Sequence, residues 1–324
     1  MKNGKISQNQ WNRSVGKKIL YRSDRLAERA AAGRDTAGYR FLPDFTVCTT
    51  MQTEKGPVAL LGKKAFYRMY NALAASGAAA DSILVQLLLP EHAAENEVKA
   101  VMEQLGRYTA AYKTAMGAVQ VEVSAEVNAP FLTLSGIGKK TGREESNSAF
   151  QPGQQIVMTK WAGAFGAAEL SYMWKESLVQ KFPAVYIEEV NAYLTEKAGG
   201  ESLLSIERES EIARQFGARA FHAVSKNGVF GALWEMAELS GTGLQVDLEA
   251  IPVRQESIEI CEQYDENPYE MDSLGCLLIG TEAGEELVRL LRQKDISAAV
   301  IGQVTAGNDR VIRRGEETRF LTPP

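Results

Sequence analysis

Residues 221–243 constrain the fold most, because a β-rich run, a glycine turn and a helical apolar pattern follow one another there. Glu235 and Glu238 fall on the opposite side of the predicted helix from its apolar stripe. That stripe consists of Val229, Leu233, Met236 and Ser240, with Ala232 and Ala237 beside it. Gly241 is a typical helix terminator. The stretch therefore predicts a buried strand end, a tight turn and an amphipathic helix.

Gly228 and Gly231 begin this helix, and two interpretations of them remain open. The backbone N–H groups of a first helical turn have no intrahelical partner, so they can bind an anion. Because glycine has no Cβ, the anion can approach these groups closely. Alternatively, the glycines only allow the strand and the helix to pack closely. A lone Gly-x-x-Gly pair is compatible with both.

Composition excludes several classes of protein. The 324 residues carry 36 basic and 41 acidic side chains, a net charge of −5, and no long basic block. This argues against non-specific nucleic-acid binding. Cys48, Cys261 and Cys276 lack CxxC spacing, which predicts reduced thiols rather than a disulfide framework or a zinc site. With a polar start and no apolar run approaching about 18 residues, we expect a cytoplasmic protein without a membrane span.

Alternating helix and strand patterns predict an α+β or α/β-like fold with two domains, residues 1–150 and 151–324, divided at a polar stretch, 138–152. In the first domain the patterns predict helices over 11–31, 58–76 and 95–112, and a small-residue loop at 32–38. Strands are predicted over 45–50, 83–89, 119–127 and 131–137. The strand over 83–89 is expected to be buried on both faces, and the strand over 119–127 to have one face in water and a hairpin-like connection to the next strand.

In the second domain the predicted strands are 155–161, 244–248, 274–280, 298–304 and 311–312. Helices are predicted from 163, over 183–197, 205–216 and 256–264, and after Thr281, which is expected to be an N-cap. Acidic residues near the start of this last helix and basic residues near its end match the helix dipole.

Several segments together resemble a known family. They are Pro152-Gly-Gln, Gly163-x-x-Gly166, Gly228-Val-Phe-Gly-Ala-Leu-Trp-Glu-Met-Ala-Glu, Ile251-Pro-Val-Arg, Ser273-Leu-Gly-Cys-Leu-Leu-Ile and Ala298-Ala-Val-Ile-Gly-Gln-Val. On these, the chain resembles the aminoimidazole ribonucleotide (AIR) synthase-related superfamily over essentially its whole length, and within it the hydrogenase maturation factor-like branch. The resemblance implies an AIR synthase fold in which the amino-terminal sheet forms a barrel across a homodimer and a carboxy-terminal α+β domain packs beside it.

Active members of the superfamily bind Mg-ATP between the domains, and acidic residues hold the magnesium. At the matching positions this sequence keeps Asp35 but otherwise has Arg34, Met51, Ala72 and Ala223. A methionine thioether is a poor ligand for a hard cation. The glycine-rich phosphate turn is replaced around Val119. The resemblance therefore assigns no catalytic residue and no metal site, and it leaves ATP and magnesium binding in doubt.

Six positions match the family's nucleotide cleft and are the candidate cofactor-binding residues: Asp35, Asn71, Lys160, His222, Lys226 and Gly228. Most have an ordinary alternative. Asp35 is a metal ligand or a loop acid, His222 is a site residue or a hydrogen-bonded structural residue, and Lys160 with Trp161 holds an anion or packs. Lys226 places a cation in the turn, where it could bind phosphate without a metal.

Two functions follow from this pattern. The first is a non-catalytic binding or regulatory homologue with a degenerate Mg-ATP site, a homodimer that recognises a small anionic metabolite or pairs with an active paralogue. The second is an ATP-dependent phosphoryl-transfer enzyme whose rearranged site uses Asp35, Glu122, Lys226 and His222, with Glu54 or Glu122 able to replace a lost ligand. The chain's last residues, 320–324, lack the reactive cysteine tail of the maturation factor, so carbamoyl dehydration on such a tail is not expected.

Overall fold

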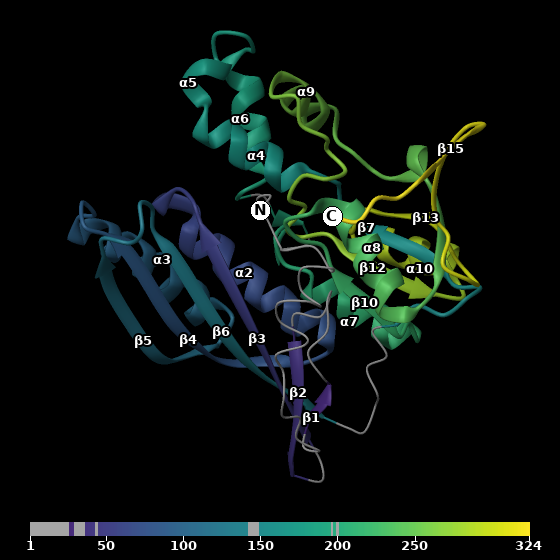
Figure 1. The fold of residues 1–324 in the computed structure, drawn as a ribbon, viewed down its shortest axis with the longest axis horizontal. Coiled ribbons are helices and arrows are strands. Elements are labelled where there is room, and N and C mark those ends of the chain that lie inside the picture. Colours follow the sequence, from purple (N-terminus) through teal and green to yellow (C-terminus); the bar gives the residue numbers. More distant parts are fainter. Residues whose placement is uncertain (1–25, 29–35, 43–44, 142–148, 196, 199–200) are drawn as a thin grey trace. The chain divides into compact units, whose positions relative to one another are not determined.

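The computed structural model describes residues 26–28, 36–42, 45–141, 149–195, 197–198 and 201–324. Contacts divide the chain into two compact units, one containing residues 36–141 and the other containing residues 149–324. Each unit has its own sheet and helices (Figure 1), which confirms the predicted mixed α and β architecture. The boundary at residue 150 stays a prediction, since residues 142–148 lie outside the described part of the chain.

The first unit contains a six-stranded sheet with the order β1-β2-β3-β6-β4-β5. Its elements are β1 (Leu26–Glu28), β2 (Thr36–Leu42), β3 (Phe45–Lys55), α2 (Val58–Ser76), β4 (Ala79–Pro90), α3 (Glu95–Ala111), β5 (Ala115–Ser124) and β6 (Phe131–Thr141). Only β4 and β5 pair in parallel, joined by α3. The predicted helix over 11–31 is wrong in its described part, because residues 26–28 form a strand that pairs with β2. The predicted loop over 32–38 is likewise wrong from Thr36 on.

Helix α2 packs along the sheet (Figure 1), and its extent is the one predicted. Gly77 ends it in the left-handed conformation, with φ of 79°, which glycine adopts without strain. Gly136 on β6 allows the close approach of the helix, because a Cβ there would lie about 2.6 Å from Met69 Cγ. Sheet and helix thus share one core, with Leu61, Phe66, Met69 and Leu73 fully buried.

The prediction that the strand over 83–89 is buried on both faces is wrong. Ile83, Val85 and Leu87 are buried, whereas Leu84 between them is 42% exposed. Apolar residues occupy both sides of β4, but among the described residues of this unit only one side is buried. A continuous apolar run therefore did not reveal which face is covered.

The predicted hairpin between the strand over 119–127 and the next strand is also wrong. β5 ends at Ser124, and β4 lies between β5 and β6 in the sheet. Val119, Val121 and Val123 are 43 to 58% exposed although they are in register with buried residues of β4. As an edge strand, β5 has a neighbour on one side only. The valine face of β5, which the alternating pattern predicts to be buried, is therefore about half exposed.

The second unit contains a seven-stranded sheet with the order β10-β12-β7-β13-β11-β14-β15. Its strands are β7 (Gln155–Thr159), β10 (Ala220–Ala223), β11 (Gly243–Asp247), β12 (Leu277–Thr281), β13 (Ala298–Thr305), β14 (Arg310–Arg314) and β15 (Glu317–Phe320), and a separate pair is β8 (Lys197–Ala198) with β9 (Glu201–Ser202). Its helices are α4 (Ala164–Met173), α5 (Lys175–Leu178), α6 (Ala184–Ala192), α7 (Glu207–Phe216), α8 (Gly228–Ser240), the 3₁₀ turn η2 (Leu248–Ala250), α9 (Gln255–Gln263) and α10 (Gly284–Arg292).

The apolar stripe of α8 is buried as predicted, against a core that contains Ile156, Leu244, Leu278 and Ile301. Helices α4, α6 and α9 lie together (Figure 1). In the parts of the chain that the structure describes, no helix meets the length and apolarity needed to cross a membrane.

Helix α10 begins differently from the prediction. Its predicted N-cap, Thr281, is still in β12, and the helix starts at Gly284. The Gly284 N–H donates to Gln155 Oε1 at 2.7 Å, so a side chain from a distant strand satisfies the helix start. The predicted charge pattern is confirmed, with Glu285 and Glu286 in the first turn and two arginines in the last.

We expect Gln155→Ala to lower the free energy of unfolding by about 1 kcal/mol, the typical effect of losing a helix cap. Chemical denaturation followed by circular dichroism measures it. Thr281→Val is the matched comparison, because Thr281 Oγ1 accepts only a long 3.4 Å hydrogen bond from Ala283 N. An equal loss in both variants would contradict the assignment of Gln155 as the cap.

Candidate functional site

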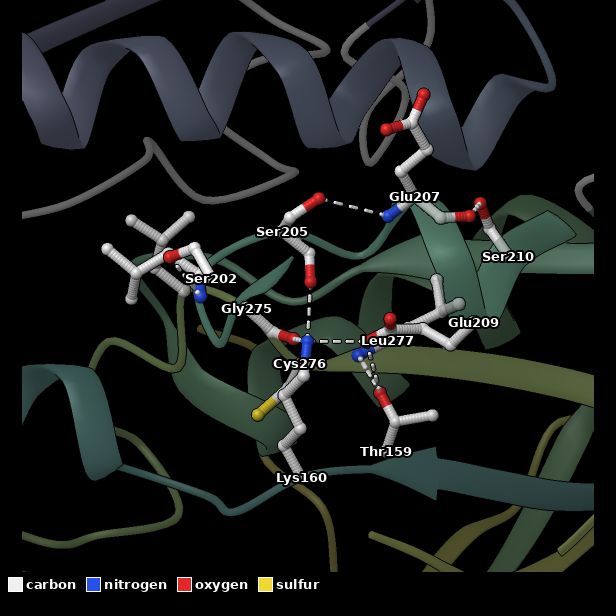
Figure 2. Close-up of polar contacts among 12 residues, drawn as sticks. Thr159, Lys160, Ser202, Ser205, Glu207, Glu209, Ser210, Gly275, Cys276 and Leu277 are labelled. Carbon is white, nitrogen blue, oxygen red and sulfur yellow. Dashed lines mark hydrogen bonds and ion pairs between the residues drawn. The ribbon is translucent and has the colours of Figure 1, made fainter. Parts of the chain in front are cut away.

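Lys160 lies at the end of β7, and its ammonium group is buried inside the second unit (Figure 2). Nζ donates to the carbonyl oxygens of Ser205 at 2.5 Å and Gly275 at 2.9 Å. It also forms an ion pair of 2.5 Å with Glu209 Oε1 on α7. An ammonium group has three hydrogens, so these three acceptors match its full donor capacity.

Glu209 is part of the same network (Figure 2). Thr159 Oγ1 donates to Glu209 Oε1 at 3.4 Å and accepts a hydrogen bond from Leu277 N at 3.1 Å. Lys160, Thr159 and Glu209 thus connect the end of β7 with α7 and β12 beneath the protein surface. The Cys276 thiol lies beside this network, and burial raises the pKa of this thiol to about 12. Such a group is protonated at neutral pH and is a poor nucleophile.

A small cavity adjoins this network, lined by residues that include Lys160, Trp161, Ser205 and Arg208. Its volume of about 40 Å³ has room for water but not for a nucleotide. Trp161 also stacks with a cation of its own unit, because the Arg254 guanidinium lies 4.0 Å from its ring centroid. The geometry supports the packing interpretation of Lys160 and Trp161, and their role as an anion site stays a prediction.

The glycine turn before α8 packs against one loop, residues 267–273. Gly228 has φ of 63°, and a Cβ there would clash with the backbone of Tyr269 and Glu270. The Phe230 N–H donates to the Tyr269 carbonyl at 3.1 Å. A first-turn donor of α8 is therefore used by a backbone carbonyl, which supports the packing interpretation of the glycines.

The same loop satisfies the start of α4. Gly163 N donates to Ser273 Oγ at 2.8 Å, and Gly166 N donates to the Asp272 carbonyl at 2.8 Å. A Cβ at Gly163 would lie 2.6 Å from the Pro268 carbonyl oxygen. Both glycine-rich helix starts are thus capped by residues 267–273, a partner that no local pattern indicated.

His222 on β10 pairs with Glu235 on α8, the helix that follows β10 in the chain. The His222 Nε2 and Glu235 Oε2 atoms are 2.9 Å apart, and His222 is 9% exposed. Glu235 is predicted to face away from the apolar stripe, but its side chain is only 12% exposed and bonds to His222 on β10. This geometry supports the structural interpretation of His222, and its place in a ligand site stays a prediction.

The remaining candidates are Lys226, Gly228, Asn71 and Asp35. Lys226 is partly exposed in the turn and has an interaction partner within the chain. Gly228 has the packing described above. Asn71 is 2% exposed on α2 in the first unit and also has an interaction partner. Asp35 lies outside the described residues. As sites for a ligand, all of them stay predictions.

The first unit contains a buried charge cluster that the sequence patterns did not single out. Glu54 on β3 forms ion pairs with Arg68 and, at 3.5 Å, with Lys64, all three nearly inaccessible to water. Lys64 Nζ also donates to the Lys55 carbonyl at 2.9 Å. Two cations therefore already neutralise Glu54, which disfavours a second role as a magnesium ligand. A period-2 pattern in β3 would have placed Glu54 on the covered face, but its partners on α2 carry no sequence signal.

Two of the positions matched to the family's acids and glycines, Met51 and Val119, are exposed. Met51 is 68% exposed on β3, and Val119 is 47% exposed on β5. Met51 is in register with Ser135 and, across β6, with Leu84 on the uncovered face of the sheet. Within the described ranges, no three His, Cys, Asp or Glu side chains gather closely enough to hold a metal ion.

We expect Lys160→Met to lower the free energy of unfolding by about 3–5 kcal/mol, because it leaves the Glu209 carboxylate buried without its cation. The double variant Lys160→Met with Glu209→Met should recover a large part of this loss, since it removes both charges. Urea unfolding of the two single variants and the double variant gives the coupling energy. Additive effects would contradict the direct pairing.

Comparison with known proteins agrees with this architecture. Residues 151–314 match the family model described as AIR synthase related protein, C-terminal domain. A carbamoyl dehydratase HypE from Rhodobacter capsulatus is 25% identical over 296 residues, which cover 89% of this chain and 82% of that protein. A phosphoribosylformylglycinamidine synthase subunit PurL from Anaeromyxobacter dehalogenans is 29% identical over 186 residues, which cover 56% of this chain and 20% of that protein.

Solved structures share the fold at lower sequence identity. HypE in a complex with HypF superposes with a TM-score of 0.70 and 18% identity, covering 89% of this chain and 93% of that one. The thiamine monophosphate kinase of Aquifex aeolicus superposes with a TM-score of 0.67 and 15% identity, covering 94% of this chain and 96% of that one. Since the family model covers half of the sequence and the fold agrees over both units, the chain belongs to the AIR synthase-related proteins.

Proposed function

We propose that this chain is a hydrogenase maturation factor-like member of the family that has lost magnesium-dependent use of ATP and acts as a binding or regulatory protein. The observation that carries the proposal is the loss of acids at matched positions, with Met51, Ala72 and Ala223 in their places. A phosphoryl-transfer site needs metal ions or other cations to neutralise the charge that develops on the phosphoryl group.

The surroundings of these positions support the proposal. Met51 is 68% exposed, and its thioether is a poor ligand for magnesium. Glu54, the nearest acid on the same strand that was a candidate replacement, is buried between Arg68 and Lys64. His222 is likewise engaged by Glu235.

The competing function is an ATP-dependent phosphoryl-transfer enzyme with a rearranged site that uses Asp35, Glu122, Lys226 and His222. Similar folds favour it, since one solved HypE structure is a complex with ATP and one thiamine monophosphate kinase structure is a complex with AMPPCP and TMP. Glu122 is exposed on β5 and is sterically able to bind a metal.

Calorimetry with ATP, with and without magnesium, separates the two functions. We expect magnesium to change the affinity for ATP by less than about tenfold, or about 1.4 kcal/mol. A phosphate-release assay should show no turnover, and the Rhodobacter capsulatus HypE serves as the positive control. Magnesium-dependent micromolar binding, or phosphate release that Glu122→Gln abolishes, would contradict the proposal and favour the enzyme.

We also propose that the protein is a homodimer formed through the uncovered face of the first unit's sheet. That face carries apolar side chains, Met51 and Leu84, that are 68% and 42% exposed. Burial of such a patch is a usual reason for association.

The ligand that Lys226 would suit best is a small anionic metabolite.

We expect Leu84→Asp to shift the protein from dimer to monomer, because the sheet face would then bury two carboxylates near the symmetry axis. Light scattering during size-exclusion chromatography measures the mass. Glu91→Asp, at an exposed position just after β4, is the control and should leave the mass unchanged. A wild-type monomer at about 10–100 μM would overturn this interface, since an interface of standard size gives far tighter association.

A further inference from the structure

The second unit contains a groove of about 370 Å³ that includes none of the six candidate cofactor-binding residues. It lies between the β14–β15 hairpin, the loop around residues 267–270 and the first turn of α8. Its lining includes Phe230, Tyr269, Glu270, Arg314, Arg319 and Phe320. The volume falls within the range of sites for small organic molecules.

One wall of the groove is a pair of stacked aromatic rings. The Phe230 and Tyr269 ring centroids are 5.2 Å apart, and the ring planes differ by 11°. The backbones of the two residues are joined by the hydrogen bond from Phe230 N to the Tyr269 carbonyl, and Tyr269 N donates to Asn267 Oδ1 at 3.1 Å. Because both residues are anchored by backbone hydrogen bonds and pack against the core of the unit, their stacked rings offer a surface for another planar ring.

The hairpin adds a third ring and two cations. Phe320 on β15 is 70% exposed, which is unusual for so large an apolar side chain. Arg319 pairs with Glu317 at 3.4 Å within the hairpin. Arg314 lies 3.9 Å from Glu249, and both of these side chains are 70% exposed. An ion pair as long and as exposed as that of Arg314 contributes little, so a ligand anion can replace it at small cost.

The charges of the lining also restrict the ligand. Arg314 and Arg319 are balanced by Glu270 and Glu317, so the formal charge of the groove is zero. Glu270 accepts a hydrogen bond of 3.1 Å from Asn267 Nδ2, which holds its carboxylate in place. A triphosphate would meet these two carboxylates, whereas a single negative charge can bind Arg314 with little repulsion.

We propose that this groove binds a small aromatic carboxylate, with its ring against Phe230 and Tyr269 and its carboxylate on the Arg314 guanidinium. The planar guanidinium group matches a carboxylate in two parallel hydrogen bonds. Burial raises the pKa of Tyr269, and the positive charge of Arg314 opposes this rise. The cation therefore lies beside the aromatic wall. This site does not depend on the fate of the Mg-ATP site.

Titration of the full chain with indole-3-acetate, followed by ligand-observed NMR and calorimetry, tests the proposal. We expect saturable binding with a Kd below about 1 mM, the range of a fragment-sized ligand. Arg314→Gln should weaken it about tenfold or more, because it removes the charged partner. The neutral analogue indole-3-ethanol should bind the wild type correspondingly more weakly.

Arg289→Gln is the matched control, since Arg289 is an exposed arginine on α10 outside the groove and pairs with Glu286 in the same way as Arg319 with Glu317. Circular dichroism verifies that each variant is folded. Absence of binding to the wild type, or equal losses in Arg314→Gln and Arg289→Gln, would overturn the proposal. Displacement of indole-3-acetate from the wild type by ATP, together with ATP binding that Arg314→Gln weakens, would assign the groove to a nucleotide instead.

Discussion

The second unit depends on the backbone of residues 267–276, which supplies hydrogen-bond acceptors to three separate elements. Its carbonyls and the Ser273 hydroxyl accept from first-turn N–H groups of α4 and α8, and the Gly275 carbonyl accepts from Lys160. These donors are buried, and each would cost free energy if it were left without a partner. Gly163, Gly166 and Gly228 are needed because the loop approaches them too closely for a side chain.

This arrangement changes the meaning of the glycine turns. Taken alone, such turns suggest anion binding, since a helix start offers free donors and positive charge. Here a peptide loop takes the donors of Gly166 and Phe230, and Lys160 is satisfied by Glu209 and two carbonyls. These donors are thus satisfied by contacts within the chain itself, which is compatible with a function other than phosphoryl transfer.

Much of the secondary structure was predictable. Helix α2 has the predicted bounds, and α8 has the predicted apolar stripe, because both combine a strong 3.6-residue period with a terminal glycine. The errors share one physical cause, which is that sheet neighbours are non-local. The alternating pattern over 119–127 indicated a strand, but nothing in it indicated a parallel partner beyond α3 rather than a hairpin. The cap of α10 failed similarly, since Gln155 is 129 residues away from Gly284.

The candidate site was less predictable than the fold. The residue types at positions 51, 72 and 223 are a property of the sequence alone, as are the family resemblance, the charge balance and the periodic elements. Only the tertiary structure decided that Lys160 faces Glu209, that His222 faces Glu235, and that Glu54 is shared between Arg68 and Lys64. Periodicity specifies which face of an element a side chain occupies, whereas the partner on the other side is chosen by packing between segments far apart in the chain.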